Sequence, residues 1–78
     1  MWKRENNALK NTFEFKDFKV SIDFVNKVST LAEKHNHHPD ILIQYNKVTL
    51  ILTTHHAGSV ITESDEKMAK EIDEFFAL

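Results

Sequence analysis

Residues 41–55 read ILIQYNKVTLILTTH, and this pattern predicts two strands joined by a tight turn. The expected strands are Ile41–Tyr45 and Val48–His55, with the turn at Asn46-Lys47 because asparagine tolerates a positive φ. The second strand is rich in β-branched residues, which favour extended backbone. Every second position of this strand is apolar, and these positions are Val48, Leu50 and Leu52. The positions between them carry both polar and apolar residues. One face of this hairpin is therefore apolar, as in a sheet that helices cover on one side only.

A long helix is expected before the hairpin, over Asp17–His35, and Asn36 and Pro39 should end it. Its apolar residues form two partly overlapping stripes, which are Phe18, Ile22, Val25 and Ala32, and Val20, Phe24, Val28 and Leu31. A helix with two apolar faces needs two partners. We expect one face on the sheet and the other against a neighbouring subunit or the second helix.

The two ends of the chain complete the predicted fold. Trp2–Glu5 and Leu9–Phe15 flank a polar turn at Asn6-Asn7 and indicate a first hairpin. Thr62 opens a last helix, with Asp65 three residues on in a capping-box pattern. The order β-β-α-β-β-α predicts one α+β domain over residues 1–78. It should form a four-stranded antiparallel sheet with helices packed on one face.

Composition excludes several classes of site. The chain has no Cys, so disulfides, thiolate nucleophiles and Cys-ligated metals are ruled out. It has one Gly, which excludes glycine-rich phosphate and dinucleotide loops. Ten Lys and Arg stand against twelve Asp and Glu, and the basic residues are scattered, so we expect no nucleic-acid partner.

Size favours self-association. Below roughly 70–80 residues one core seldom supplies more than about 3–5 kcal/mol, and this 78-residue chain has no disulfide to support it. We therefore expect a homo-oligomer. We read no signal peptide and no run of 18 apolar residues, which predicts a cytoplasmic protein without a membrane span.

All five histidines fall between positions 35 and 56, and they are His35, His37, His38, His55 and His56. Imidazole titrates close to neutral pH, so such a cluster suits proton transfer. Two other interpretations stay open. Each histidine can be a surface or capping residue, an interpretation we favour for His35 and His56, or three of them can hold zinc.

A spaced signature runs through the same region. It consists of Glu33-Lys34-His35-Asn36-His37-His38-Pro39, then Tyr45 after five residues, His55 after nine more, and Asp65. Together with the Phe-rich run at 13–18 and the segment at 45–48, this pattern resembles the pterin-4a-carbinolamine dehydratase family over nearly the whole chain.

The resemblance implies a hydro-lyase that converts 4a-hydroxytetrahydropterin to quinonoid dihydropterin plus water. In tetrahydrobiopterin recycling this step restores the cofactor of aromatic amino acid hydroxylases. It implies no metal and no bound cofactor, and a homodimer or homotetramer. The implied catalytic residues are His37, His38 and His55. The implied pterin-binding residues are Asn36, His37, His38, Thr53, Thr54, His55 and His56, and the supporting residues are Glu33, Pro39, Tyr45 and Asp65.

The chain departs from the family pattern in three places. The helix that usually precedes the Trp is expected to be absent, and the first turn is shorter. The segment after His55 is one residue longer, with His56 where many relatives carry another polar residue. A different class of function also stays open, since some relatives stabilise the dimer of a transcription factor. The stripe with Val20, Phe24 and Leu31, if exposed, suits such a contact.

Overall fold

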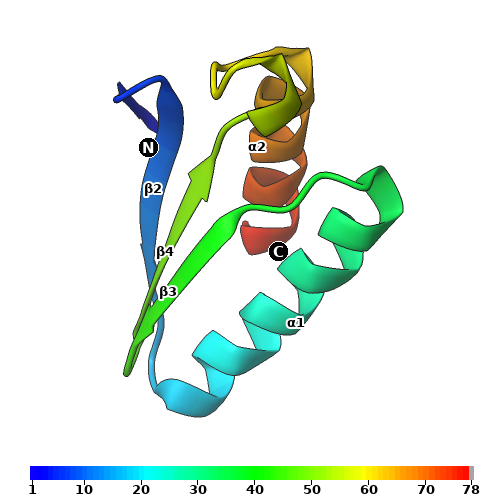
Figure 1. The fold of residues 1–78 in the computed structure, drawn as a ribbon. Coiled ribbons are helices and arrows are strands. Elements are labelled where there is room, and N and C mark those ends of the chain that lie inside the picture. The colour runs from blue at the N-terminus through cyan, green and yellow to red at the C-terminus, as the bar shows by residue number, and fades with distance from the viewer. Residues whose placement is uncertain (78) are drawn as a thin grey trace.

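The computed structural model describes residues 1–77 as one sheet with two helices on the same side of it (Figure 1). In chain order the elements are β1 (Lys3–Glu5), β2 (Ala8–Glu14), α1 (Phe18–His35), β3 (Asp40–Gln44), β4 (Lys47–Leu52), the 3-10 turn η1 (His55–Ala57) and α2 (Glu63–Phe76). The strands are antiparallel throughout and lie in the order β1-β2-β4-β3. The predicted α+β fold is confirmed.

The core lies between the sheet and the helices. Val48, Leu50 and Leu52 are fully buried, so the predicted apolar face of β4 is the one that the helices cover. The remaining core side chains come from β2 and both helices and include Leu9, Phe13, Phe24, Val28, Ala32, Met68 and Ile72. Neither helix within residues 1–77 is long and apolar enough to cross a bilayer.

The turn between β3 and β4 lies one residue earlier than predicted. Gln44 pairs with Lys47, so the turn residues are Tyr45 and Asn46, and Tyr45 carries the positive φ of 53°. Lys47 also pairs with Glu14 of β2, which fixes it inside the strand. The first hairpin turn at Asn6-Asn7 is confirmed, with φ values of 51° and 60°.

The prediction that the last strand continues to His55 is wrong. β4 ends at Leu52, and the chain then folds back on itself. The Thr54 N–H donates to the Val60 carbonyl at 2.9 Å and closes a loop that contains η1. Local β-propensity favours a longer strand, but β2 and β3 offer no pairing partner beyond Leu52. His55 and His56 therefore lie in this loop instead of in the sheet.

Helix α1 begins and ends where the sequence predicts. Asp17 is its N-cap and accepts a hydrogen bond from the Val20 N–H at 2.9 Å. At the other end Asn36 adopts a left-handed conformation, with φ of 48°. This residue turns the chain out of the helix axis and toward α2.

The stripe of α1 that contains Phe24 is less exposed than a partner-binding surface requires. The buried residues of α1 are Ser21, Phe24, Val28 and Ala32. Phe24 is 5% exposed and Val28 is fully buried, so these two residues of the stripe face the core, whereas Val20 and Leu31 are half-buried. Phe18, on the other predicted stripe, is 50% exposed.

Candidate functional site

A fully buried carboxylate, Asp65, lies in the first turn of α2. Thr62 is the N-cap, and its backbone N–H donates to Asp65 Oδ2 at 2.9 Å. The Thr54 hydroxyl, just beyond β4, donates to the same oxygen at 2.6 Å. The helix start and the end of the central strand are thus joined at one side chain.

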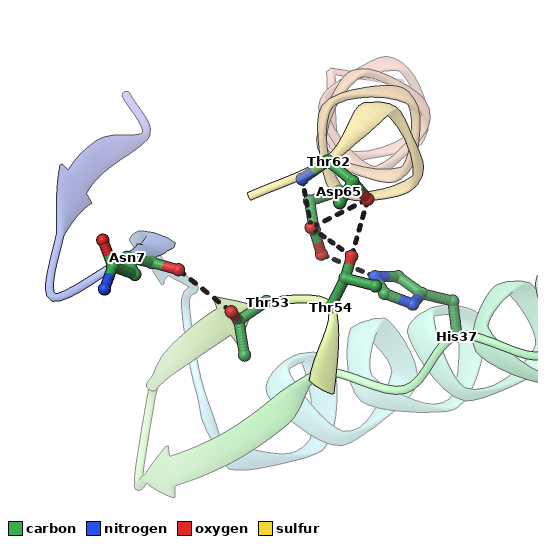
Figure 2. A network of polar contacts seen from close by, with 6 residues as sticks. All are labelled: Asn7, His37, Thr53, Thr54, Thr62 and Asp65. Atoms are coloured by element: carbon green, nitrogen blue, oxygen red, sulfur yellow. Dashed lines mark hydrogen bonds and ion pairs between the residues drawn. The ribbon is translucent and has the colours of Figure 1, made fainter. Parts of the chain in front are cut away.

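His37 contacts the other oxygen of this carboxylate. Its Nε2 lies 2.5 Å from Asp65 Oδ1, and its side chain is 12% exposed. The ring reaches α2 because Asn36 reverses the chain direction and the His37 N–H bonds back to the Ala32 carbonyl at 3.0 Å. Figure 2 shows His37, Thr54 and Thr62 converging on Asp65 from three segments.

The environment of Asp65 keeps its carboxyl group ionised. Burial by itself raises the pKa of Asp65, but hydrogen bonds from Thr54, the Thr62 N–H and His37 outweigh it, and the pKa lies below its usual 3.8. An ionised carboxylate only accepts hydrogen bonds. His37 must therefore donate from Nε2, so in the neutral ring the proton lies on Nε2 and Nδ1 is the free ring nitrogen.

The neighbouring histidines are held differently. His38 Nε2 lies 2.5 Å from Glu33 Oε2, and these side chains are 55% and 75% exposed. Glu33, expected as a supporting residue, thus contacts one of the proposed catalytic rings. His35 Nε2 lies 2.6 Å from Glu71 Oε2, and both atoms are buried. His35, expected at the surface or as a cap, instead links α1 to α2.

The side chains of Thr53 and Thr54, which follow β4, point in different directions. Thr54 is 2% exposed and faces Asp65, whereas the Thr53 hydroxyl donates to the Asn7 carbonyl at 2.9 Å and points away (Figure 2). His55 and His56 are exposed in η1. Within residues 1–77 neither of these two imidazoles has a side-chain hydrogen bond to the protein.

The remaining predicted residues make no hydrogen bond to Asp65 within residues 1–77. Pro39 is half-buried next to His38, and Asn36 is exposed and acts through its backbone as the C-cap of α1. Tyr45 is 66% exposed in the β3–β4 turn, at the opposite end of β4 from Thr54. The structure thus gathers His37, Thr54 and Asp65, places His55 next to Thr54 in the chain, and keeps Tyr45 apart.

A small pocket of about 140 Å³ opens between the end of α1 and the start of α2. Its lining residues are His35, His37, Ser64, Lys67 and Met68. No sequence pattern points to Ser64, Lys67 or Glu71, because their part in this region depends on helix packing. Within the described residues no group of three His, Asp or Glu side chains is arranged so that it could hold a metal ion.

The arrangement suits proton transfer. His37 is fixed by a buried anion, so its ring has one orientation and one tautomer. His38 and His55 are accessible to solvent and can exchange protons with water. His37 is thus ordered by a buried partner, whereas His38 and His55 are exposed.

Several known proteins are similar to this chain in sequence. Residues 1–75 match the family described as pterin 4 alpha carbinolamine dehydratase. A protein of Sulfurisphaera tokodaii named "Putative pterin-4-alpha-carbinolamine dehydratase" is 51% identical over 73 residues, covering 94% of this chain and 77% of that protein. A protein of the same name from Trichodesmium erythraeum is 54% identical over 71 residues, covering 91% of this chain and 75% of that one.

Two solved structures share the fold. The "transcriptional coactivator/pterin dehydratase" of Brucella melitensis superposes with a TM-score of 0.87 at 35% identity, covering 94% of this chain and 79% of that one. A pterin dehydratase-like protein identified as a RuBisCO assembly factor in the alpha-carboxysome has a TM-score of 0.75 at 20% identity, covering 95% and 84%, and shows the fold alone. On the family match and these identities, the chain belongs to the pterin 4 alpha carbinolamine dehydratase family.

Proposed function

We propose that the protein is a 4a-hydroxytetrahydropterin dehydratase that works by histidine acid–base catalysis. The observation that carries this proposal is the bond between His37 and the buried Asp65, which orders one imidazole of the family signature. Family membership supplies the substrate class. The physiological setting that we infer is tetrahydrobiopterin recycling for aromatic amino acid hydroxylases, in the cytoplasm.

The reaction needs two proton movements. The hydroxyl on C4a accepts a proton and leaves as water, while a ring nitrogen loses a proton as the quinonoid product forms. Two imidazoles in opposite protonation states accomplish this without a net change in protein charge. Each such contribution is typically about 10²–10⁴-fold in rate.

The roles follow from how each ring is held. His38 and His55, which are exposed, serve as the acid and base on the two faces of the reacting centre. His37, whose position Asp65 fixes, binds and orients the pterin ring. Because the Thr53 and Thr54 hydroxyls are already bonded within the protein, His55 and His56 are the side chains of that segment that face the substrate.

Single replacements test the assignment. His37→Ala, His38→Ala and His55→Ala should each slow dehydration of synthetic 4a-hydroxytetrahydropterin by about 10²-fold or more. Lys19→Ala is the control, because Lys19 lies on the exposed surface of α1 and pairs only with Asp23 in the described residues, and it should keep the parent rate. Parent-like rates in all three alanine variants would show the assignment to be wrong.

Metal dependence is a separate question with a direct answer. Acid–base chemistry of this kind needs only side-chain proton carriers. Activity should therefore survive exhaustive treatment with a chelator, followed by assay in chelator-containing buffer. Loss of activity that added zinc restores would instead favour a metal-dependent reaction.

A second candidate function is a protein-binding one. The Brucella melitensis relative is described as a transcriptional coactivator as well as a pterin dehydratase. In this chain the large apolar residues exposed on α1 and β3 include Phe18 and Leu42, at 50% and 52%. A dimerisation cofactor would use such a surface, and Phe18→Glu would then abolish partner binding while pterin dehydration continues.

A further inference from the structure

Thr54 has a buried hydroxyl with two close polar neighbours. The residue is 2% exposed, and its Oγ1 lies 2.6 Å from Asp65 Oδ2 and 2.6 Å from the Thr62 hydroxyl (Figure 2). A threonine hydroxyl has one proton to donate. Its position therefore raises the question of which neighbour receives that proton.

Counting protons gives one answer. Ionised Asp65 has no proton to donate, so Thr54 donates to it, and Thr62 must then donate its own proton to Thr54. The hydroxyls thus point in one direction, from Thr62 through Thr54 to Oδ2. The Thr62 N–H adds a further donor to Oδ2, and His37 occupies Oδ1.

We propose that Thr54 is a positioning residue that holds the Asp65 carboxylate in the rotamer and charge state that fix the tautomer of His37. In its effect on catalysis this inference rests on the dehydratase function proposed above. The resemblance to the family implied a direct contact between Thr54 and the pterin. The buried hydroxyl is already bonded within the protein, so Thr54 acts through Asp65 instead.

The consequence of removing this hydroxyl is specific. Asp65 Oδ2 would keep only the Thr62 N–H as a close donor, because the Thr62 hydroxyl lies 3.5 Å away. With fewer donors in a buried site, the carboxylate becomes more basic and less firmly oriented. The carboxylate would then hold His37 less firmly in the tautomer that carries its proton on Nε2.

The first measurement does not depend on the reaction. Thr54→Val removes the hydroxyl and keeps the shape, Thr54→Ser keeps the hydroxyl, and Thr49→Val is the matched control. Thr49 is another buried threonine, bonded to the Thr12 hydroxyl at 2.8 Å on the open face of the sheet. Carboxyl ¹³C NMR should show the midpoint of Asp65 raised in Thr54→Val alone. Nitrogen NMR of His37 should show a smaller share of the tautomer protonated on Nε2 in the same variant.

The second measurement is the rate. Thr54→Val should lower kcat for 4a-hydroxytetrahydropterin about tenfold, as expected when a hydrogen bond to a charged group is lost, with KM little changed. Thr54→Ser should restore most of the rate. An Asp65 midpoint in Thr54→Val equal to that in Thr49→Val would overturn the proposal, and so would an equal kcat in these two variants.

Two further outcomes are informative. If Thr54→Val does not fold, Thr54→Ala replaces it and should raise the Asp65 midpoint in the same way, and an unchanged midpoint there overturns the proposal. If the parent protein does not dehydrate the pterin, the proposed function fails. The NMR measurements then still decide whether Thr54 controls Asp65 and His37.

Discussion

Burial distinguishes histidines that the sequence presents as equivalent. His37 is 12% exposed and bonded to a buried carboxylate, whereas the adjacent His38 is 55% exposed and contacts a surface glutamate. Adjacent residues in extended backbone point in different directions, so only one of the two can reach α2. This difference gives the pair two roles in the proposed reaction, one in orientation and one in proton exchange.

Asp65 gives the protein an acid-sensitive contact. Because the folded pKa of Asp65 lies below its unfolded value, the carboxylate stabilises the fold fully above about pH 4. That contribution is lost as the pH falls through the folded pKa. We expect Asp65→Asn to lower the free energy of unfolding by about 1–3 kcal/mol at pH 7. Below pH 4 the difference from the parent should shrink.

Urea unfolding at a series of pH values measures this difference. Asp73→Asn is a suitable control, because Asp73 is an exposed residue of the same helix that accepts a hydrogen bond from the Trp2 side chain. A gap between parent and Asp65→Asn that stays constant from pH 7 to pH 3 would contradict the assignment of an ionised, hydrogen-bonded Asp65.

At the level of elements, the end of α1 determines where His37 goes. Asn36 has a φ of 48°, a conformation that asparagine and glycine adopt readily and β-branched residues avoid. Asn36→Gly should therefore keep the stability of the parent, and Asn36→Val should lose about 1–2 kcal/mol. Thermal unfolding followed by circular dichroism checks both. Equal stability of the two variants would mean that the turn does not require this conformation.

The β3–β4 turn contains a residue that is poorly suited to it. Tyr45 has a φ of 53° and is 66% exposed, so it gains little from packing. Replacing it with asparagine should relieve the strain and stabilise the protein by about 1 kcal/mol. Chemical denaturation gives the value. Destabilisation would show that the tyrosine ring makes a contact that matters more than the backbone strain.

Comparing the end of α1 with the β3–β4 turn shows which turns can be predicted from local sequence. Asn36 and the Asn6-Asn7 turn are predictable because one residue type suits one conformation. The predicted β3–β4 turn is one residue late because its position depends on the pairing of Lys47 with both Gln44 and Glu14. The end of β4 also depends on tertiary pairing. Thr54 bridges to Val60 instead of continuing the strand, and local β-propensity does not indicate this bridge.

The site is predictable in its residue types but not in its contacts. The histidine signature and the capping-box pattern at Thr62 identify the residues. That Asp65 bonds to His37, 28 positions earlier, follows only from how α2 packs beside the end of α1. The same holds for His35 and Glu71, whose contact no spacing in the sequence indicates.

At the level of the whole molecule, β3 is an uncovered edge. It is the last strand in the sheet order, and Ile41 and Leu42 are 38% and 52% exposed on it. Exposed apolar edge strands favour association with another chain.

We therefore propose a homodimer or homotetramer, with a mass by light scattering of two or four times 9.1 kDa. Leu42→Lys should shift the population toward smaller species, whereas Lys19→Glu on exposed α1 surface should not. A parent protein of 9.1 kDa at all concentrations would contradict this prediction.

The bond between Asp65 and the Thr62 N–H closes the first turn of α2, and the same side chain holds His37. Fraying of that turn therefore withdraws the carboxylate from the imidazole, so helix unwinding and loss of the ordered ring are one thermodynamic event. Linkage then works in both directions. A molecule that binds only to the ordered His37 slows hydrogen exchange at the amides that begin α2, even where it touches none of them.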